Sequence, residues 1–159
     1  MKIALLLVSM TLAAAAPSIA QQKSEGRNLA ELAFDSVDTQ GRGYVDQGAM
    51  DAFGEDIRYS MDANDDGKIT LDEWTGWDFG YALLAEQLGK ELAYQTAMKI
   101  VFAVQDRDGD GEISRVEWRK AGIRDFRRAD LNDDAILTKE EFLNGFLITS
   151  AIKAALKPE

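Results

Sequence analysis

The sequence predicts an all-α protein of four helix-loop-helix units in two duplicated halves, with short strands that pair the loops. Acidic segments of twelve residues recur three times, and apolar residues at helical spacing flank each of them. The pattern of residues 28–80 recurs, shifted by 68 positions, within residues 96–150. The only prolines, Pro17 and Pro158, lie near the ends of the chain, so no proline interrupts a helix between them.

Helices are expected on both sides of every loop, because apolar residues recur there at intervals of three and four positions. Gly76 and Gly80 interrupt this pattern. The aromatic residues at that interruption, Trp77, Phe79 and Tyr81, are expected in the core, and a partner-binding patch is the alternative. The expected helices cover residues 28–37, 47–61, 71–79, 82–105, 115–129 and 139–156.

The three acidic segments carry oxygen-bearing side chains at fixed positions. They read DANDDGKITLDE (62–73), DRDGDGEISRVE (106–117) and DLNDDAILTKEE (130–141). The first two satisfy the pattern D-x-[DN]-x-[DN]-G-x5-E in full. In such a loop, positions 1, 3, 5, 7, 9 and 12 direct oxygens to one point, at the ~2.3 to 2.6 Å that Ca²⁺ requires. The segments therefore predict binding sites for a hard cation.

The expected ligands follow from these positions. Positions 1, 3 and 5 supply carboxylates or amides, position 7 a main-chain carbonyl, position 9 a hydroxyl, which acts through water for Ser114, and position 12 a bidentate Glu. In the first segment they are Asp62, Asn64, Asp66, Lys68, Thr70 and Glu73. In the second they are Asp106, Asp108, Asp110, Glu112, Ser114 and Glu117. In the third they are Asp130, Asn132, Asp134, Ile136, Thr138 and Glu141.

The internal repeat identifies a fourth loop and a weaker site. Residues 38–49 read DTQGRGYVDQGA, and Gln40, Arg42 and Ala49 stand at positions 3, 5 and 12. This loop is therefore expected only to pair with another loop. Ala135 replaces glycine at position 6 of the segment 130–141, where left-handed backbone costs alanine about 1 kcal/mol. Weaker metal binding is expected there, and an empty loop is the alternative.

These features resemble the EF-hand superfamily of calcium-binding proteins. Family members have an apolar residue at position 8, in a short strand that pairs two loops; here these residues are Val45, Ile69, Ile113 and Leu137. Aromatic residues after the final Glu are Trp74, Trp118 and Phe142, and those four residues before a loop are Phe34, Phe102 and Phe126. The resemblance implies helix-loop-helix units and Ca²⁺ as the ligand, with two to three ions per chain.

The loops within each half are close together in sequence. Twelve residues, 50–61 and 118–129, separate them, about half the number in calmodulin-like proteins. A single helix through Gly54 would be about 22 Å long and would hold its two loops apart. The first loop would then pair with the fourth and the second with the third. The alternative is a sharp turn at Gly54 and Gly122 that lets neighbouring loops pair.

This short spacing resembles lanmodulin, an exported bacterial EF-hand protein that binds lanthanides. The loop chemistry differs, because lanmodulin has proline at position 2 and Asp at position 9, where the three intact loops here have Thr70, Ser114 and Thr138. Each missing Asp removes a negative charge that would favour a trivalent ion. Ca²⁺ is therefore the expected ion, and a lanthanide is the alternative.

Composition limits the other functions of the chain. The net charge is −10, and it is −11 for residues 21–159, so nucleic acid and anionic lipid should be repelled. Without Cys or His, the chain cannot use thiolate nucleophiles, histidine-based triads or the usual zinc ligands. Because the conspicuous acidic residues are already assigned to loops, no enzymatic activity is expected.

The first twenty residues predict an export signal. Lys2 precedes an apolar run at 3–16 and a small-x-small site at 18–20, which predicts cleavage before Gln21. A retained anchor is the alternative, but the run is shorter than the ~20 residues that span a bilayer. The expected organisation is a signal peptide at 1–20, a flexible leader at 21–27 and one domain at 28–159. Export of a chain without cysteine predicts a periplasmic or secreted protein, without membrane contact after cleavage.

Two roles are open for bound Ca²⁺. One is a buffer or a structural module stabilised by the ion, and the other is a sensor that exposes an apolar groove to a protein partner. Sensors of this type have grooves rich in methionine, and only Met50, Met61 and Met98 follow the signal, which favours the first role. The apolar face of the last helix is expected in the core; it consists of Phe142, Phe146, Ile152 and Leu156.

Overall fold

A computed structural model describes residues 25–157 of the chain. The expected signal peptide, 1–20, and residues 21–24 of the expected leader lie outside this range. The first helix begins at Glu25 instead of residue 28, so the last part of the expected leader is helical. Within 25–157, no helix has the length and apolar character needed to span a bilayer.

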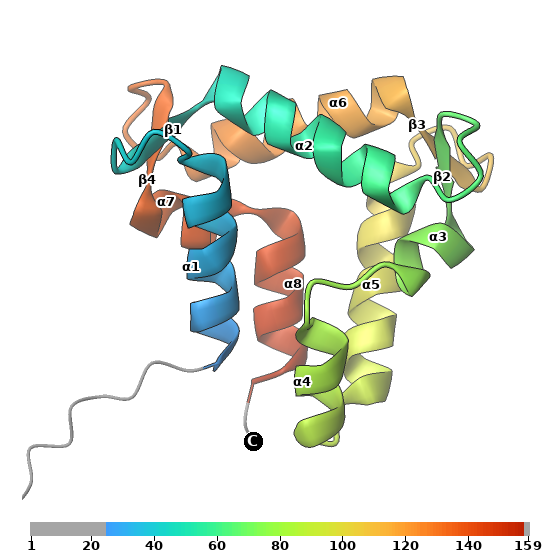
Figure 1. Cartoon of the computed structure of the whole chain (residues 1–159). Coiled ribbons are helices and arrows are strands. Elements are labelled where there is room, and N and C mark those ends of the chain that lie inside the picture. The colour runs from blue at the N-terminus through green and yellow to red at the C-terminus, as the bar shows by residue number, and fades with distance from the viewer. Residues whose placement is uncertain (1–24, 158–159) are drawn as a thin grey trace, which may run out of the picture.

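Helices joined by short strands make up the described chain, which confirms the all-α fold class with short loop-pairing strands (Figure 1). In order, the elements are α1 (Glu25–Val37), β1 (Tyr44–Asp46), α2 (Gln47–Met61), β2 (Lys68–Thr70), α3 (Leu71–Gly76), α4 (Tyr81–Gln87), α5 (Glu91–Gln105), β3 (Glu112–Ser114), α6 (Arg115–Ala129), β4 (Ile136–Thr138), α7 (Lys139–Gly145) and α8 (Leu147–Ala155).

The loops pair between the two halves of the chain. Strand β1 is antiparallel to β4, with Val45 opposite Leu137, and β2 is antiparallel to β3, with Ile69 opposite Ile113. All four of these apolar side chains are fully buried. The structure therefore confirms the predicted pairing of the first loop with the fourth and of the second with the third.

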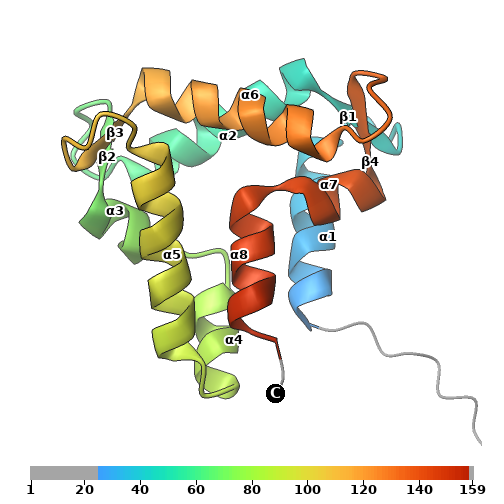
Figure 2. The ribbon, with the colours of Figure 1, turned by 180° about the vertical axis from the view of Figure 1, so that it is seen from behind.

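Helices α2 and α6 set this arrangement, because each is an uninterrupted helix of 15 residues. α2 runs from β1 to β2, and α6 returns beside it from β3 to β4, so the two helices bridge the loop pairs at opposite ends of the molecule (Figures 1 and 2). Trp118 Nε1 of α6 donates a hydrogen bond to the Gly54 carbonyl of α2 (3.0 Å). The sharp turn considered for Gly54 and Gly122 does not form.

Two apolar clusters, one beneath each loop pair, form the core. Beneath β1 and β4, Phe34 of α1 meets Phe142 of α7 edge to face at 5.4 Å between ring centroids. Beneath β2 and β3, the residues at the equivalent repeat positions, Phe102 and Trp74, make the same kind of contact at 6.2 Å. The face expected in the core is there: Phe142, Phe146 and Ile152 are buried and Leu156 is half-buried against the second cluster.

The helix expected over 82–105 is two helices, and the expectation was wrong at Gly89. α4 ends there because Gly89 adopts left-handed backbone, with φ +62°. Its N–H donates to the Glu86 carbonyl (3.0 Å), and the Lys90 N–H donates to the Ala85 carbonyl (2.8 Å). This paired bonding satisfies the last carbonyls of α4 and turns the chain into α5.

The expected helices at 71–79 and 139–156 also end early. α3 stops at Gly76, and Trp77 continues in extended backbone (φ −85°, ψ 136°). α7 stops at Gly145, where any Cβ atom would overlap the backbone and side chain of Ala129 at the end of α6. Phe146 is extended (φ −76°, ψ 138°) and buried, with its ring 5.0 Å from that of Phe142. The break lets two short helices pack in different directions.

Replacement of Gly145 by alanine should destabilise the fold by about 1 to 3 kcal/mol, because the new methyl group overlaps Ala129. The measurement is the free energy of urea-induced unfolding at fixed Ca²⁺ concentration. Gly122→Ala is the matched control, since Gly122 lies within α6 and a Cβ there meets no atom within 4 Å. It should leave stability unchanged or raise it by up to about 1 kcal/mol. Equal effects of both substitutions would contradict the close approach of α7 to α6.

Candidate metal sites

The loops at 62–73 and 106–117 are closed by the aspartate at position 1. Asp62 accepts hydrogen bonds from the backbone N–H groups of Asp66 (3.0 Å) and Gly67 (2.8 Å). Asp106 accepts one from Gly111 (3.0 Å). Gly67 and Gly111 have left-handed backbone, with φ +86° and +90°. Glycine adopts this conformation without strain, so both loops curl around the position where an ion would bind.

The loop at 130–141 has the same shape although it lacks the glycine. Ala135 adopts φ +64°, and its N–H donates to the Asp130 carboxylate at 3.0 Å. A residue with a Cβ atom is therefore held in the left-handed region, as the sequence led us to expect, at a strain of about 1 kcal/mol. The loop keeps its ligand positions and carries this strain.

Side chains at positions 3 and 5 lie side by side in the two loops that have Asn at position 3. The Asn64 amide nitrogen is 3.0 Å from an Asp66 oxygen, and the Asn132 amide nitrogen is 2.9 Å from an Asp134 oxygen. The residues expected to supply main-chain carbonyls, Lys68, Glu112 and Ile136, begin strands β2, β3 and β4.

The glutamate at position 12 caps the start of the helix that follows each loop. Glu117 Oε2 accepts hydrogen bonds from the backbone N–H (2.9 Å) and hydroxyl (2.7 Å) of Ser114. Its Oε1 accepts one from the Arg107 N–H at 2.7 Å. Thr70 with Glu73 and Thr138 with Glu141 form the same capping box. The expected ligands at positions 9 and 12 of each loop are thereby held together at the start of the following helix.

These hydrogen bonds keep the position-12 carboxylates ionised. The pKa of Glu117 falls to about 2, chiefly because of the backbone N–H of Ser114. The corresponding backbone N–H groups of Thr70 and Thr138 lower the pKa of Glu73 and of Glu141. At neutral pH each loop therefore presents a charged glutamate to a cation.

In the loop at 106–117 three carboxylates lie close together, and the expected ligand Asp110 is not part of this group. Oxygen atoms of Asp106, Asp108 and Glu117 all lie within 4.8 Å of one another, and Glu117 is buried. At an effective dielectric near 20, each pair of charges at that separation repels by roughly 3 kcal/mol. A bound cation removes this repulsion. The donor set, all oxygen and strongly anionic, fits a hard ion such as Ca²⁺.

The loop at 38–49 carries its own cation. The Arg42 guanidinium pairs with Asp46 (3.0 Å) and lies 4.6 Å from the centre of the Tyr44 ring. Asp38 closes the loop by accepting hydrogen bonds from the backbone N–H groups of Arg42 (2.9 Å) and Gly43 (2.6 Å). A fixed positive charge at position 5 opposes a metal ion. This arrangement favours the predicted role of the loop as a pairing partner only.

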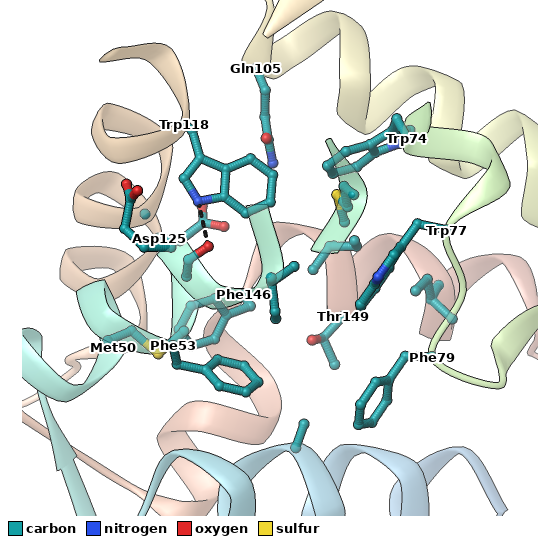
Figure 3. A pocket seen from close by; sticks show the side chains of 18 of the residues that line it. Met50, Phe53, Trp74, Trp77, Phe79, Gln105, Trp118, Asp125, Phe146 and Thr149 are labelled. Atoms are coloured by element: carbon teal, nitrogen blue, oxygen red, sulfur yellow. Dashed lines mark hydrogen bonds between the residues drawn. The ribbon is translucent and has the colours of Figure 1, made fainter. Parts of the chain in front are cut away.

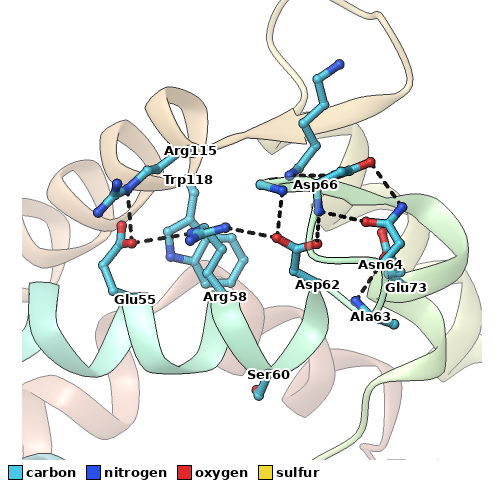
Figure 4. A network of polar contacts seen from close by, with 12 residues as sticks. Glu55, Arg58, Ser60, Asp62, Ala63, Asn64, Asp66, Glu73, Arg115 and Trp118 are labelled. Carbon is cyan, nitrogen blue, oxygen red and sulfur yellow. Dashed lines mark hydrogen bonds and ion pairs between the residues drawn. The ribbon is translucent and has the colours of Figure 1, made fainter.

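An ion-pair network that the sequence analysis missed reaches the first complete loop (Figure 4). Arg58 of α2 is buried, and its Nη1 lies 3.4 Å from an oxygen of Asp62, the position-1 ligand. Its Nε is 3.4 Å from Glu55, which also pairs with Arg115 of α6 at 3.1 Å. The sequence did contain a signal for this ion pair, because Arg58 stands four residues before Asp62, a spacing that places the two side chains on the same face of a helix. The charge of Arg58 lowers the negative potential that the loop offers to a cation.

Comparison with known proteins agrees with this geometry over part of the chain. The family model described as EF hand matches residues 59–75 and 98–121, which include the loops at 62–73 and 106–117. These matches support an EF-hand calcium-binding protein. The search of curated proteins and the search of solved structures gave no significant match.

Ala135→Gly should raise the Ca²⁺ affinity of the loop at 130–141 about fivefold, because the left-handed turn no longer strains a Cβ atom. Gly111→Ala, the reciprocal change, should lower the affinity of the loop at 106–117 by a similar factor. Titration calorimetry measures both affinities, and Glu141→Gln identifies the binding event that belongs to the loop at 130–141. Unchanged affinity in both variants would contradict the assigned strain.

Arg58→Gln should raise the Ca²⁺ affinity of the loop at 62–73 severalfold, about 1 kcal/mol, because it removes a positive charge next to Asp62. The measurement is calorimetric titration at low and high salt. Arg124→Gln, an exposed position on α6, removes the same charge away from Asp62 and serves as the control. An identical change in both variants would show that only the net charge matters.

Proposed function

We propose that this protein is an exported EF-hand protein that binds two to three Ca²⁺ ions, as a buffer or as a structural module stabilised by the ion. The observation that carries the proposal is the convergence of Asp106, Asp108 and Glu117 carboxylates within 4.8 Å, in a loop whose glutamate stays ionised. The matches to the EF-hand family model support Ca²⁺ as the ion.

The strand pairing leads us to expect different numbers of bound ions at the two ends of the molecule. β2 and β3 join the loops at 62–73 and 106–117, which both have a full ligand set. β1 and β4 join the strained loop at 130–141 to the loop at 38–49, which holds Arg42. We expect two ions at the first end and one, bound more weakly, at the second.

A structural role is favoured over a sensor role by the packing of the apolar helix faces. Phe142, Phe146 and Ile152 already lie in the core. Each loop pair joins one half of the chain to the other, so ions bound there fasten the contact between the halves. Because Ca²⁺ binds the folded loops and not the unfolded chain, it should raise the unfolding temperature.

Ca²⁺ is favoured over a lanthanide by the charges near the loops. Position 9 holds a neutral hydroxyl residue, Thr70, Ser114 or Thr138, in each loop with a full set of ligands. Arg58 adds a positive charge beside Asp62. Both features lower the negative potential that a trivalent ion requires. Export is supported by the apolar run at 3–16 that follows Lys2 and precedes a small-x-small site.

Titration with Ca²⁺, Mg²⁺ and La³⁺ tests the number of ions and the ion preference. Glu117→Gln should remove one strong Ca²⁺ binding event, because it removes the bidentate ligand of one loop. Glu112→Gln is the matched control: it makes the same chemical change in the same loop, but position 7 ligates through its main-chain carbonyl, so all events should remain. Loss of no event in Glu117→Gln would falsify the assignment, and tighter binding of La³⁺ with undetectable Ca²⁺ binding would replace Ca²⁺ by a lanthanide.

A further inference from the structure

A large cavity lies between the two halves, and no expected metal ligand lines it (Figure 3). Its volume is about 790 Å³, within the range of small-molecule sites. Aromatic side chains from several helices and their connections form much of its wall; they include Phe53, Trp74, Trp77, Phe79, Trp118 and Phe146. All three tryptophans of the chain are in this wall. The cavity therefore offers several ring surfaces to an occupant.

One buried polar atom in the wall has no partner among the described residues. Gln105, at the end of α5, is 8% exposed, and its buried Oε1 accepts no hydrogen bond within residues 25–157. Its side chain lies in the cavity wall between Trp74 and Trp118 (Figure 3). A buried carbonyl without a donor costs about 1 to 3 kcal/mol. An occupant with one N–H or O–H group removes that cost.

The indole N–H groups near Gln105 are already used. Trp74 Nε1 donates to the Met98 carbonyl (2.9 Å), and Trp118 Nε1 donates to the Gly54 carbonyl (3.0 Å). Trp77 Nε1 donates to the Ser60 hydroxyl at 3.0 Å. These three indoles offer an occupant their ring faces and no hydrogen bond.

Acidic groups of the wall are paired as well. Asp78 accepts a hydrogen bond from the Tyr94 hydroxyl (3.2 Å), and Glu55 pairs with Arg115 (3.1 Å). Asp125 pairs with Arg128. Since these carboxylates already have partners, they do not call for a cationic ligand.

We propose that the cavity is a binding site for a neutral, ring-containing small molecule that donates one hydrogen bond to the Gln105 side chain. The aromatic side chains of the wall hold the rings by burial and stacking, and the unpartnered Gln105 oxygen orients the molecule. This site uses none of the expected metal ligands, so it stands apart from the proposed Ca²⁺ function.

A helix of a protein partner fits the cavity less well. An α-helix with side chains is about 10 Å across, so the cavity volume equals roughly 10 Å of helix, or two turns. Thr149 and Ile152 of α8 already line one side. By volume, a compact ligand therefore matches the cavity more closely than a longer partner helix does.

The uncharged dye N-phenyl-1-naphthylamine, which has aromatic rings and one N–H group, is the probe. Added to the purified protein with Ca²⁺, it should bind one site saturably, with a rise in dye emission and quenching of tryptophan emission. Gln105→Leu should weaken binding about five- to tenfold through loss of the acceptor. Gln95→Leu, on an exposed position of α5, should have no effect. The N-methyl form of the dye, without a donor, should bind both variants and the parent protein equally.

A second pair of variants tests the cavity itself. Thr149→Phe should fill part of the cavity and abolish dye binding, and Ser150→Phe, exposed at the next position of α8, should not. Circular dichroism establishes that each variant folds. The proposal is overturned by unsaturable dye binding, by equal affinity of the Gln105→Leu and Gln95→Leu variants, or by an amphipathic Leu/Lys helical peptide binding where the dye does not.

Discussion

The length of helices α2 and α6 is the constraint on which the arrangement of the molecule depends. Each has 15 residues without a break, about 22 Å, so the two loops of one half lie at opposite ends and cannot meet. A short strand in a loop needs a partner for its backbone groups, and the partner comes from the other half. The two halves are thereby joined twice, at β1 with β4 and at β2 with β3. Between these two joints, the helices enclose the aromatic cavity.

Loop closure and helix initiation use the same side chains. Glu117 caps α6 through Ser114 and also approaches Asp106 and Asp108, so an ion bound to Glu117 acts directly on the helix start. This coupling gives metal binding a mechanical effect on the fold. The two loop pairs are similar in backbone because of the repeat, but they differ in charge. The pair β1 and β4 includes the positive charge of Arg42, whereas the loops joined by β2 and β3 have acidic residues at their expected ligand positions.

Much of the fold and of the candidate sites was predictable from local sequence patterns. The ligand positions depend on spacing within twelve residues, and the backbone of Gly67, Gly111 and Ala135 follows from their place in that spacing. Continuous helix through Gly54 followed from apolar residues at helical spacing in α2, which are Met50, Phe53, Ile57 and Met61. The loop pairing followed from the length of that helix. The break at Gly89 was also local in origin, because a glycine in left-handed backbone ends many helices. It was missed because apolar residues at helical spacing, Leu84, Leu88 and Leu92, continue across it.

By itself, the sequence determined the loops, the positions of the expected ligands, the strained position and the helices that separate the loops, because each depends on residues close together in the chain. Only the tertiary structure decided the break between α7 and α8, the ion pair of Glu55 with Arg115, and the cavity beside Gln105. These features depend on contacts between segments that are distant in sequence or on the packing of several helices at once. Local sequence patterns do not specify such contacts.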